Sequence, residues 1–296
     1  MNPVIMHINY CEAASNSFGK RTIDDICRIA ADIGYDGIQF RGKAPKEMAE
    51  LSFRNFAELI ADAKKKYGLS DILFGIGVAN CTSEDKEARE KGIANAIENA
   101  KIANDLCGTT VSNCFGPRLL STIPNAPRSG EFNGSAVATE RDWDFTADAY
   151  SRVGRELEKT GVKFAFETHA IYINDTPQAT KKLVDLIDSP AVGVNMDYGN
   201  TVYFPEHPTL EECIDLYGDK LFYIHFKNSS AVPGTKARIP TNLCDGEINH
   251  HAYLKKLRDV GFTGPMCIEA PRNGDRIWFA KQDFEYLKAV MKDVAR

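Results

Sequence analysis

The amino-acid sequence predicts one (β/α)8-barrel domain over residues 1–296. Three observations carry this prediction: short β-like runs alternate with amphipathic helical stretches, the runs number eight, and several of them are continuously apolar. Continuous apolar runs are typical of strands that are buried on both faces of a sheet. Strands that alternate with helices indicate parallel βαβ units, and eight such units favour a closed barrel over an open sheet.

The β-like runs are short, and most are bounded by Gly, Pro or Asn, residues that favour turns. We expect them to form parallel strands whose carboxyl ends lie at one common face. The predicted strands are residues 4–9, 37–40, 73–78, 109–113, 163–167, 193–197, 221–226 and 266–269.

Helical patterns of apolar residues lie between the runs. The first covers residues 23–33 and stops at Gly34, a residue suited to the left-handed turn that ends many helices. Thr22, Ser83 and Thr176 stand where helix N-caps are expected, and Pro177 fits a first helical turn. The other predicted helices are residues 48–67, 86–107, 142–160, 179–187, 210–217, 251–260 and 280–294.

Two connections, residues 115–141 and 228–249, are longer than a compact domain usually has. The first is rich in Pro, Gly, Ser and Asn, and the second carries Lys236, Arg238 and Pro240. Both follow predicted strands, which places them at the carboxyl face, where barrel active sites are built. Each is either a lid over the site or a tolerated surface insertion.

Composition and charge exclude several classes of protein. The net charge is −5 and basic residues are scattered, so no basic face is expected for nucleic acid or an anionic membrane. No apolar stretch reaches the roughly 18–20 residues that a transmembrane helix needs. The first nine residues lack the pattern of a signal peptide, and the eight cysteines form no C-x-x-C pair. We therefore expect reduced thiols and a cytoplasmic protein.

Four titratable residues stand at the ends of the last four predicted strands. Glu167, Asp197, His225 and Glu269 each close an apolar run, where a lone polar side chain would be costly to bury. Neighbouring strand ends of a closed barrel converge, so these side chains are expected to meet. The alternative requires a separate local partner for each of four equivalent positions.

Three carboxylates that lie close together cannot all stay ionised without a cation, because each raises the pKa of the others. One divalent metal ion resolves this conflict. Three carboxylate oxygens and one imidazole suit Mn²⁺, our preferred ion, and also Mg²⁺ or Co²⁺, with Zn²⁺ as a further alternative. A base that abstracts a proton beside a carbonyl, and a metal that stabilises the resulting enediolate, would together transfer protons between carbons.

Six short motifs follow one another along nearly the whole chain. They are Gly34-Tyr-Asp-Gly-Ile-Gln39, Glu167-x-His169, Asp197-Tyr-Gly199, His225-Phe-Lys227, Asp245-Gly-Glu-Ile-Asn249 and Gly261-Phe-Thr-Gly-Pro-Met-Cys-Ile-Glu269. In this order they resemble the xylose-isomerase-like barrel superfamily, in particular its sugar and sugar-phosphate isomerase/epimerase group. The resemblance implies one metal held by Glu167, Asp197, His225 and Glu269. It also implies that Glu167 and Glu269 exchange protons with the substrate's carbons from opposite sides, and that the chain forms a homodimer or homotetramer.

One position departs from the family pattern. The third residue after the strand-six Asp is frequently His in this superfamily, whereas here it is Asn200, which we keep as a candidate substrate contact. DNA-repair apurinic endonucleases of this fold use that His, others on strands two and three, and an Asp-x-His after strand seven in a multi-metal cluster. Of the six His in this chain none lies on predicted strands two or three, and the strand-seven loop reads Asp245-Gly-Glu247. A trinuclear phosphodiesterase is therefore disfavoured.

Two residues close to the predicted ligands are further candidate substrate contacts. His169 either binds substrate or holds Glu167 in place. Lys227 either contacts a substrate oxygen or forms an ion pair with a neighbouring carboxylate.

Four other candidates lie farther from the predicted ligands. His7 is expected at the end of the first strand and Arg41 at the end of the second. Both should face the barrel mouth, as substrate contacts or as ordinary rim residues. Arg238 and Arg272 lie in flanking loops. They are suited to a phosphate or carboxylate group, and solvation at the surface is the alternative.

These features predict a metal-dependent isomerase or epimerase that acts on a small sugar or ketose, phosphorylated or not. A lyase, either a dehydratase or a decarboxylase, on a keto-sugar or inosose-like substrate is an alternative, because both routes begin with the same proton abstraction. A catalytically silent sugar-binding barrel is a third hypothesis, and the presence of both glutamates counts against it.

Overall fold

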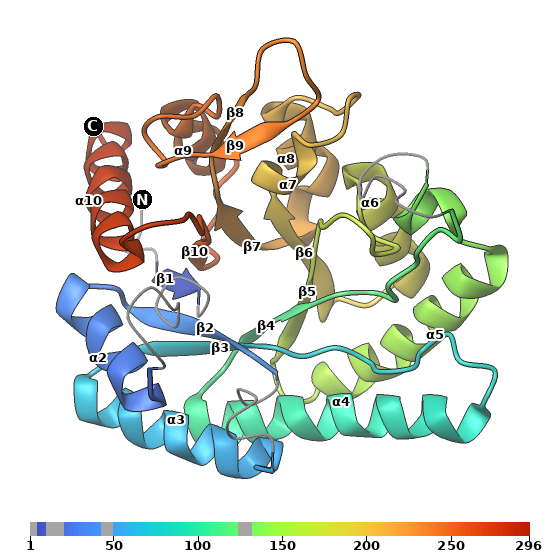
Figure 1. Ribbon diagram of the computed structural model, residues 1–296. Coiled ribbons are helices and arrows are strands. Elements are labelled where there is room, and N and C mark those ends of the chain that lie inside the picture. Colours follow the sequence, from blue (N-terminus) through green and yellow to red (C-terminus); the bar gives the residue numbers. More distant parts are fainter. Residues whose placement is uncertain (1–4, 10–20, 43–49, 124–131) are drawn as a thin grey trace. The chain divides into compact units, whose positions relative to one another are not determined.

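The computed structural model describes residues 5–9, 21–42, 50–123 and 132–296 of the chain (Figure 1). The chain forms two compact units. Unit 1 combines Met1–Leu73 with Ile224–Arg296, and unit 2 is the continuous segment Phe74–Tyr223. Each unit has its own parallel strands and its own helices.

Unit 2 carries the strands β4 (Val111–Cys114), β5 (Lys163–Glu167) and β6 (Val192–Asp197), together with the end of β3 (Asp71–Gly75). Strand β4 pairs with β3 and β5, and β5 pairs with β6, all in parallel. Every residue of β4 and β6 is buried, as expected for strands covered on both faces. The helices are α4 (Lys86–Cys107), η2 (Gly134–Val137), α5 (Glu140–Leu157), α6 (Pro177–Ile187), α7 (Tyr198–Thr201), α8 (Leu210–Tyr217) and η3 (Gly218–Lys220).

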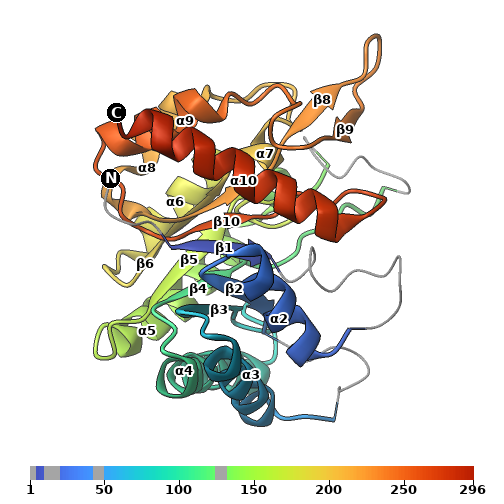
Figure 2. The same cartoon turned by 90° about the vertical axis from the view of Figure 1, so that its left-hand side faces the viewer.

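Unit 1 carries β1 (Met6–Asn9), β2 (Gly37–Arg41), β10 (Met266–Ile268) and most of β7 (Leu221–Phe226). Strand β1 pairs with β2 and with β10, and β10 pairs with β7, all in parallel. An antiparallel hairpin, β8 (Ser229–Ala231) and β9 (Arg238–Pro240), follows β7. Helix α10 packs against α9 and α2 (Figure 2). The helices of this unit are α2 (Ile23–Ile33), α3 (Phe53–Tyr67), α9 (His250–Asp259) and α10 (Arg276–Val294).

Local sequence explains where the helices begin and end. Thr22 and Asp25 form a reciprocal capping box at the start of α2, and Gly34 ends that helix with a left-handed φ of 108°. Thr176 caps α6, whose first turn holds Pro177. These predicted helix ends are confirmed.

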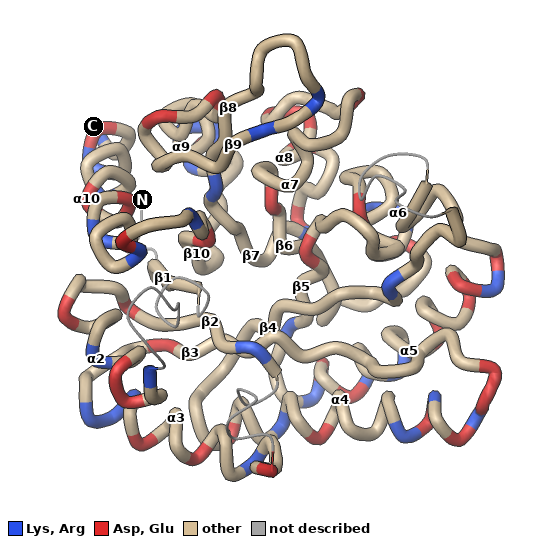
Figure 3. Tube along the Cα trace, viewed as in Figure 1, with Lys and Arg blue, Asp and Glu red and all other residues tan. Residues whose placement is uncertain are grey.

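The hydrogen-bonded strand order is β1-β10-β7-β6-β5-β4-β3-β2, closed into a barrel, which confirms the predicted (β/α)8 class. The organisation of the chain as one domain stays a prediction. Among the described residues no helix is both long enough and apolar enough to cross a membrane. Acidic and basic residues are interspersed along α4 and α10 (Figure 3).

The third strand differs from its prediction. It covers Asp71–Gly75 instead of residues 73–78. Ile76 and Val78 continue the apolar run and are buried, but the backbone N–H of Val78 donates to the hydroxyl of Tyr150 and not to a neighbouring strand. Hydrophobicity reports burial and so cannot show where the ladder of strand hydrogen bonds ends.

One helix start and one N-cap also differ. Helix α3 begins at Phe53 because the side chain of Ser52 caps it, and α4 is capped by Asp85 instead of Ser83. The other boundaries agree to within four residues. Residue 4 of the first predicted strand, residues 48 and 49 of the second predicted helix and residues 124–131 of the first long loop lie outside the described residues.

Candidate metal centre

The direction of the Glu167 side chain follows from the alternation of residues along β5. The ring of Phe166 lies 4.6 Å, between centroids, from that of Tyr150 in α5. The hydroxyl oxygen of Thr168 lies 3.1 Å from that of Tyr217 in α8. Both side chains therefore face helices. Glu167 stands between them and points to the opposite side, because successive residues of a strand alternate.

Glu167 ends β5 and Asp197 ends β6, and both carboxylates are buried. The side-chain amide of Asn200 donates to both: its Nδ2 atom is 3.3 Å from Glu167 Oε1 and 2.9 Å from Asp197 Oδ2. The backbone N–H of Asn200 also donates to Asp197 Oδ1, at 3.0 Å, so Asp197 is the N-cap of α7. Asn200 thus links the two carboxylates, which adds a positioning role to the predicted substrate contact.

Two buried amides that the sequence analysis missed extend this arrangement. Asn113 in β4 donates from Nδ2 to Glu167 Oε2 at 2.6 Å, and Asn195 in β6 donates from Nδ2 to Asn113 Oδ1 at 3.1 Å. Each stands in a strand whose other residues are mostly apolar. A buried amide needs hydrogen-bond partners, so its place in such a strand was a usable signal.

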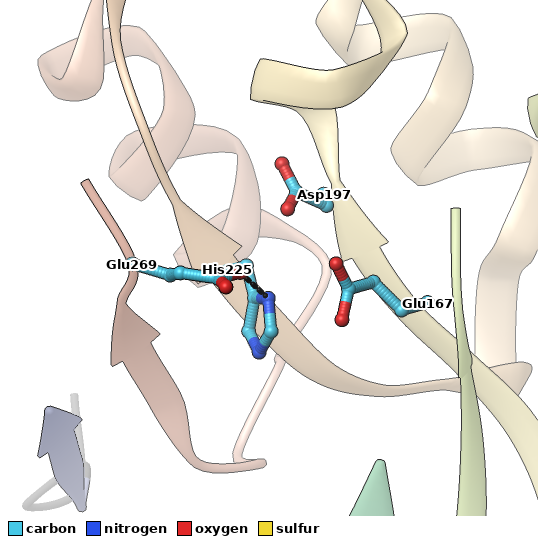
Figure 4. A group of neighbouring side chains, drawn as sticks. All are labelled: Glu167, Asp197, His225 and Glu269. Carbon is cyan, nitrogen blue, oxygen red and sulfur yellow. Dashed lines mark ion pairs between the residues drawn. The ribbon is translucent and has the colours of Figure 1, made fainter. Parts of the chain in front are cut away.

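The second pair of predicted ligands belongs to unit 1. His225 Nδ1 lies 2.8 Å from Glu269 Oε2, the contact drawn as a dashed line in Figure 4, and Lys227 Nζ lies 3.1 Å from the same oxygen. Burial acts to raise the pKa of Glu269, but the positive charge of Lys227 and the contact with His225 outweigh it. The pKa of Glu269 therefore lies well below its usual range. Of the two hypotheses for Lys227, the ion pair is present.

The other ring nitrogen of His225 also has a partner. Its Nε2 atom lies 2.6 Å from Oε1 of Gln39 in β2, and both side chains are buried. Gln39 ends the motif Gly34-Tyr-Asp-Gly-Ile-Gln39, and no role was predicted for it. The sequence feature that could have identified Gln39 is the same as for Asn113: a side-chain amide within a buried strand.

Glu167, Asp197, His225 and Glu269 each offer one ligand atom, and these four atoms all lie within 4.8 Å of one another (Figure 4). Three carboxylate oxygens and an imidazole nitrogen are a donor set that Mn²⁺ or Mg²⁺ accepts. Lys227 supplies one positive charge against three negative ones, so a divalent cation would bring the group to neutrality. The residues present therefore fit one divalent metal ion.

His169 lies two residues beyond Glu167, among aromatic side chains of unit 2. Its Nδ1 atom donates to the carbonyl oxygen of Ala170 at 2.9 Å. Its ring lies in T-shaped contact with those of Phe115, at 5.7 Å between centroids, and Tyr172, at 5.5 Å. A role in binding substrate stays a prediction for this residue.

His7 does not lie at the barrel mouth, contrary to expectation. Its Nε2 atom is 2.9 Å from Oδ2 of Asp71, the first residue of β3, and His7 pairs with Gly37, the first residue of β2. It therefore lies near the amino ends of these strands, because β1 begins only one residue earlier, at Met6. Arg41 ends β2 with an exposed side chain, and its predicted role stays open to test.

The two arginines of the flanking loops make intramolecular contacts. Arg238 donates from Nε to Ser229 Oγ at 2.9 Å and forms an ion pair with Glu247, which ties β9 to the following loop. Arg272 is only 9% exposed and forms an ion pair with Asp283 at 2.7 Å. The alternative of surface solvation is therefore wrong for Arg272.

Comparison with protein families adds an independent finding. The family model described as xylose isomerase-like TIM barrel matches residues 27–290. Inosose dehydratase from Clostridium perfringens is 24% identical over 173 residues, 53% of this chain and 58% of that protein. The inosose dehydratase from Geobacillus kaustophilus is 26% identical over 172 residues, 52% of this chain and 54% of that protein. The chain spans little more than half the length of these curated relatives.

Solved structures resemble the chain over nearly its whole length. A magnesium complex of a xylose isomerase-like TIM barrel protein from Mycobacterium smegmatis has a TM-score of 0.77 at 20% identity, covering 99% of this chain and 98% of that one. L-ribulose 3-epimerase gives 0.72 at 17% identity, with 98% and 95% covered. The probable 3-DHS dehydratase of petrobactin synthesis from Bacillus anthracis gives 0.69 at 17% identity, with 98% of both chains covered. At these identities the likeness establishes the fold alone.

Proposed function

This chain belongs to the xylose isomerase-like TIM barrel family, and from that premise we propose that it is a divalent-metal-dependent isomerase or epimerase of a small sugar or related polyhydroxylated ketone. One observation carries the proposal: two glutamates, an aspartate and a histidine form one compact donor set. Mn²⁺ is the ion we propose for it, because its donors are mainly carboxylate oxygens.

Glu167, Asp197, His225 and Glu269 would hold the metal. When bound, a divalent ion acts as a Lewis acid that polarises the substrate's carbonyl group and acidifies the neighbouring C–H bond. The proton transfers themselves fall to Glu167 and Glu269, one from each unit.

The neighbours of the two glutamates prepare them for this task. The amides of Asn113 and Asn200 donate to the two oxygens of Glu167, which fixes the direction of its carboxylate. Lys227 and His225 both contact one oxygen of Glu269, Oε2, which restricts the orientation of that carboxylate. Each carboxylate is thereby held ready to accept a proton from carbon and to return it.

One contact favours dehydration as a second candidate function. Lys227 places an ammonium group 3.1 Å from Glu269 Oε2, so a proton donor stands beside a base. In a dehydration the base removes the proton next to the carbonyl, the C–O bond at the β-carbon breaks, and the leaving hydroxyl takes a proton and departs as water. The curated relatives named inosose dehydratase support the same reading.

Metal content and solvent-isotope exchange test these proposals together. Protein purified without chelator should contain about one equivalent of divalent metal per chain. The loaded protein is then incubated with ketoses and keto-cyclitols in D₂O, with chelator-stripped protein as the control. Deuterium on carbon without loss of water supports the isomerase or epimerase, and stoichiometric loss of water supports the dehydratase. Absence of metal, or exchange that is equal after stripping, contradicts both.

A further inference from the structure

The imidazole of His225 is held from two sides by residues of its own unit. Its Nδ1 atom faces Glu269 Oε2 at 2.8 Å, and its Nε2 atom faces Gln39 Oε1 at 2.6 Å. His225 is 0% exposed and Gln39 6% exposed, so bulk water does not compete for this contact. The contact therefore fixes the plane of the ring.

The contact with Gln39 also determines which nitrogen of His225 carries hydrogen. An amide oxygen only accepts hydrogen bonds, so Nε2 must be the N–H donor. In the protonated ring Nδ1 carries hydrogen and pairs with Glu269, whereas in the neutral ring, the form that binds a metal ion, the lone pair is then on Nδ1. A histidine that ligates a metal uses its lone pair, and its other nitrogen typically donates to an oxygen, as Nε2 does here.

We propose that Gln39 is a positioning residue that selects Nδ1 of His225 as the metal-binding atom. The inference rests on the proposed function, since it assumes that His225 binds a divalent ion. Gln39 acts through His225, by orienting the ring and by holding the tautomer that presents a lone pair to the other ligands.

Charge explains why an amide suits this position better than a carboxylate. Three carboxylates, Lys227 and a divalent ion together would be neutral. A glutamate in place of Gln39 would orient the ring equally well, but it would add a fourth negative charge. That charge would make the imidazole more basic and strengthen metal binding. It would also oppose the negative charge that develops on the substrate when its proton is removed.

Metal affinity of two variants tests the inference. Gln39→Met keeps the size of the side chain but removes the acceptor, so Mn²⁺ affinity measured by calorimetry should fall about 10–100-fold. Gln39→Glu keeps the acceptor and should bind Mn²⁺ at least as tightly as the wild type, with a lower kcat. Tyr35→Phe is the matched control, because it removes another buried hydrogen bond of unit 1, that to Ala280, and should leave Mn²⁺ affinity unchanged.

Nitrogen-15 NMR of the Zn²⁺-loaded protein gives a readout that does not depend on catalysis. The wild type should show a protonated Nε2 and a metal-bound Nδ1 on His225. A wild type that binds metal through Nε2, or a Gln39→Met variant that binds Mn²⁺ as tightly as Tyr35→Phe, overturns the inference and leaves the proposed function standing. A wild type that binds no divalent ion overturns the proposed function itself. Should Gln39→Met fail to fold, two measurements still test the inference: the Mn²⁺ affinity of Gln39→Glu, and the His225 tautomer of the wild type from NMR.

Discussion

The two units stabilise their buried polar groups by different means. In unit 1 charged partners occur beside the neutral Gln39: Lys227 pairs with Glu269, and Arg272 pairs with Asp283 at 2.7 Å. The charged groups of each pair neutralise one another within the unit. A buried pair of this kind depends on both members, because removing one leaves the other charged and unpaired.

In unit 2 neutral side-chain amides help to hold the predicted ligands. The side-chain amides of Asn113, Asn195 and Asn200 form a chain that reaches Glu167 and Asp197. Amides offer dipoles but no net charge, so they orient these carboxylates without neutralising them.

The largest expected effect is on turnover. If Glu167 and Glu269 are the two proton-transfer groups, Glu167→Gln and Glu269→Gln should each lower kcat about 10³-fold despite their different surroundings, because an amide cannot accept a proton from carbon. Steady-state kinetics measures this, and Glu206→Gln, at an exposed position outside the site, is the control. Wild-type kcat in either variant would remove that residue from the mechanism.

A smaller effect separates charged from neutral partners in stability. Arg272→Met should lower the free energy of unfolding by about 3–5 kcal/mol, because Asp283 is left charged and buried. Thr168→Val in unit 2 removes a hydroxyl that lies 3.1 Å from Tyr217 and should cost only about 1–2 kcal/mol.

Urea unfolding of both variants gives these numbers. The double variant Arg272→Met/Asp283→Leu should recover most of the loss, since no uncompensated charge remains. Equal losses of unfolding free energy in Arg272→Met and Thr168→Val would show that a charged partner in unit 1 contributes no more to stability than a neutral one in unit 2.

The smallest expected effect concerns pH, and its sign differs between the units. Burial lowers the pKa of His250 in unit 1 to about 4 and raises that of Asp175 in unit 2 to about 6. The unfolded values are near 6.5 and 3.8. The stability associated with neutral His250 is full above pH 6.5 and is lost as pH falls toward 4. Ionised Asp175 destabilises the fold above pH 6, and this penalty disappears as pH falls toward 3.8.

Unfolding free energies at pH 7 and pH 5 test both signs. Between these values the wild type should lose about 2 kcal/mol through His250 and regain about 1 kcal/mol through Asp175. His250→Phe should abolish the loss, and Asp175→Asn should abolish the gain. A variant with the same pH dependence as the wild type would show that its residue is not the titrating group.

The sequence predicted the strands best where a titratable residue closes an apolar run. The ends of β5, β6 and β7 agree with their predictions, and so does the presence of Glu167, Asp197 and His225 at or near those ends. The end of β3 did not, because its apolar run continues past the last residue of the strand. Location in the cell and the assembly state stay predictions.

The partners of the ligands could not be predicted, since they depend on register between strands that are distant in sequence. Gln39 and His225 are separated by 186 positions, and Asn113 and Glu167 by 54. Nothing local to either residue identifies the other. The misplaced His7 has the same origin, because a residue's height on the barrel depends on where its strand begins.

The pairing of β1 with β10, in which Met6 lies opposite Met266, bears on how the chain folds during synthesis. Unit 2 is one continuous segment, so all its residues emerge from the ribosome before β10 does. Strand β1 is made first and can pair early with β2, but its second partner, β10, is made near the end of the chain. Contacts over such separations form slowly because closing a long loop costs entropy first. The early segment is therefore the part of the nascent chain with the longest exposure to chaperones and proteases.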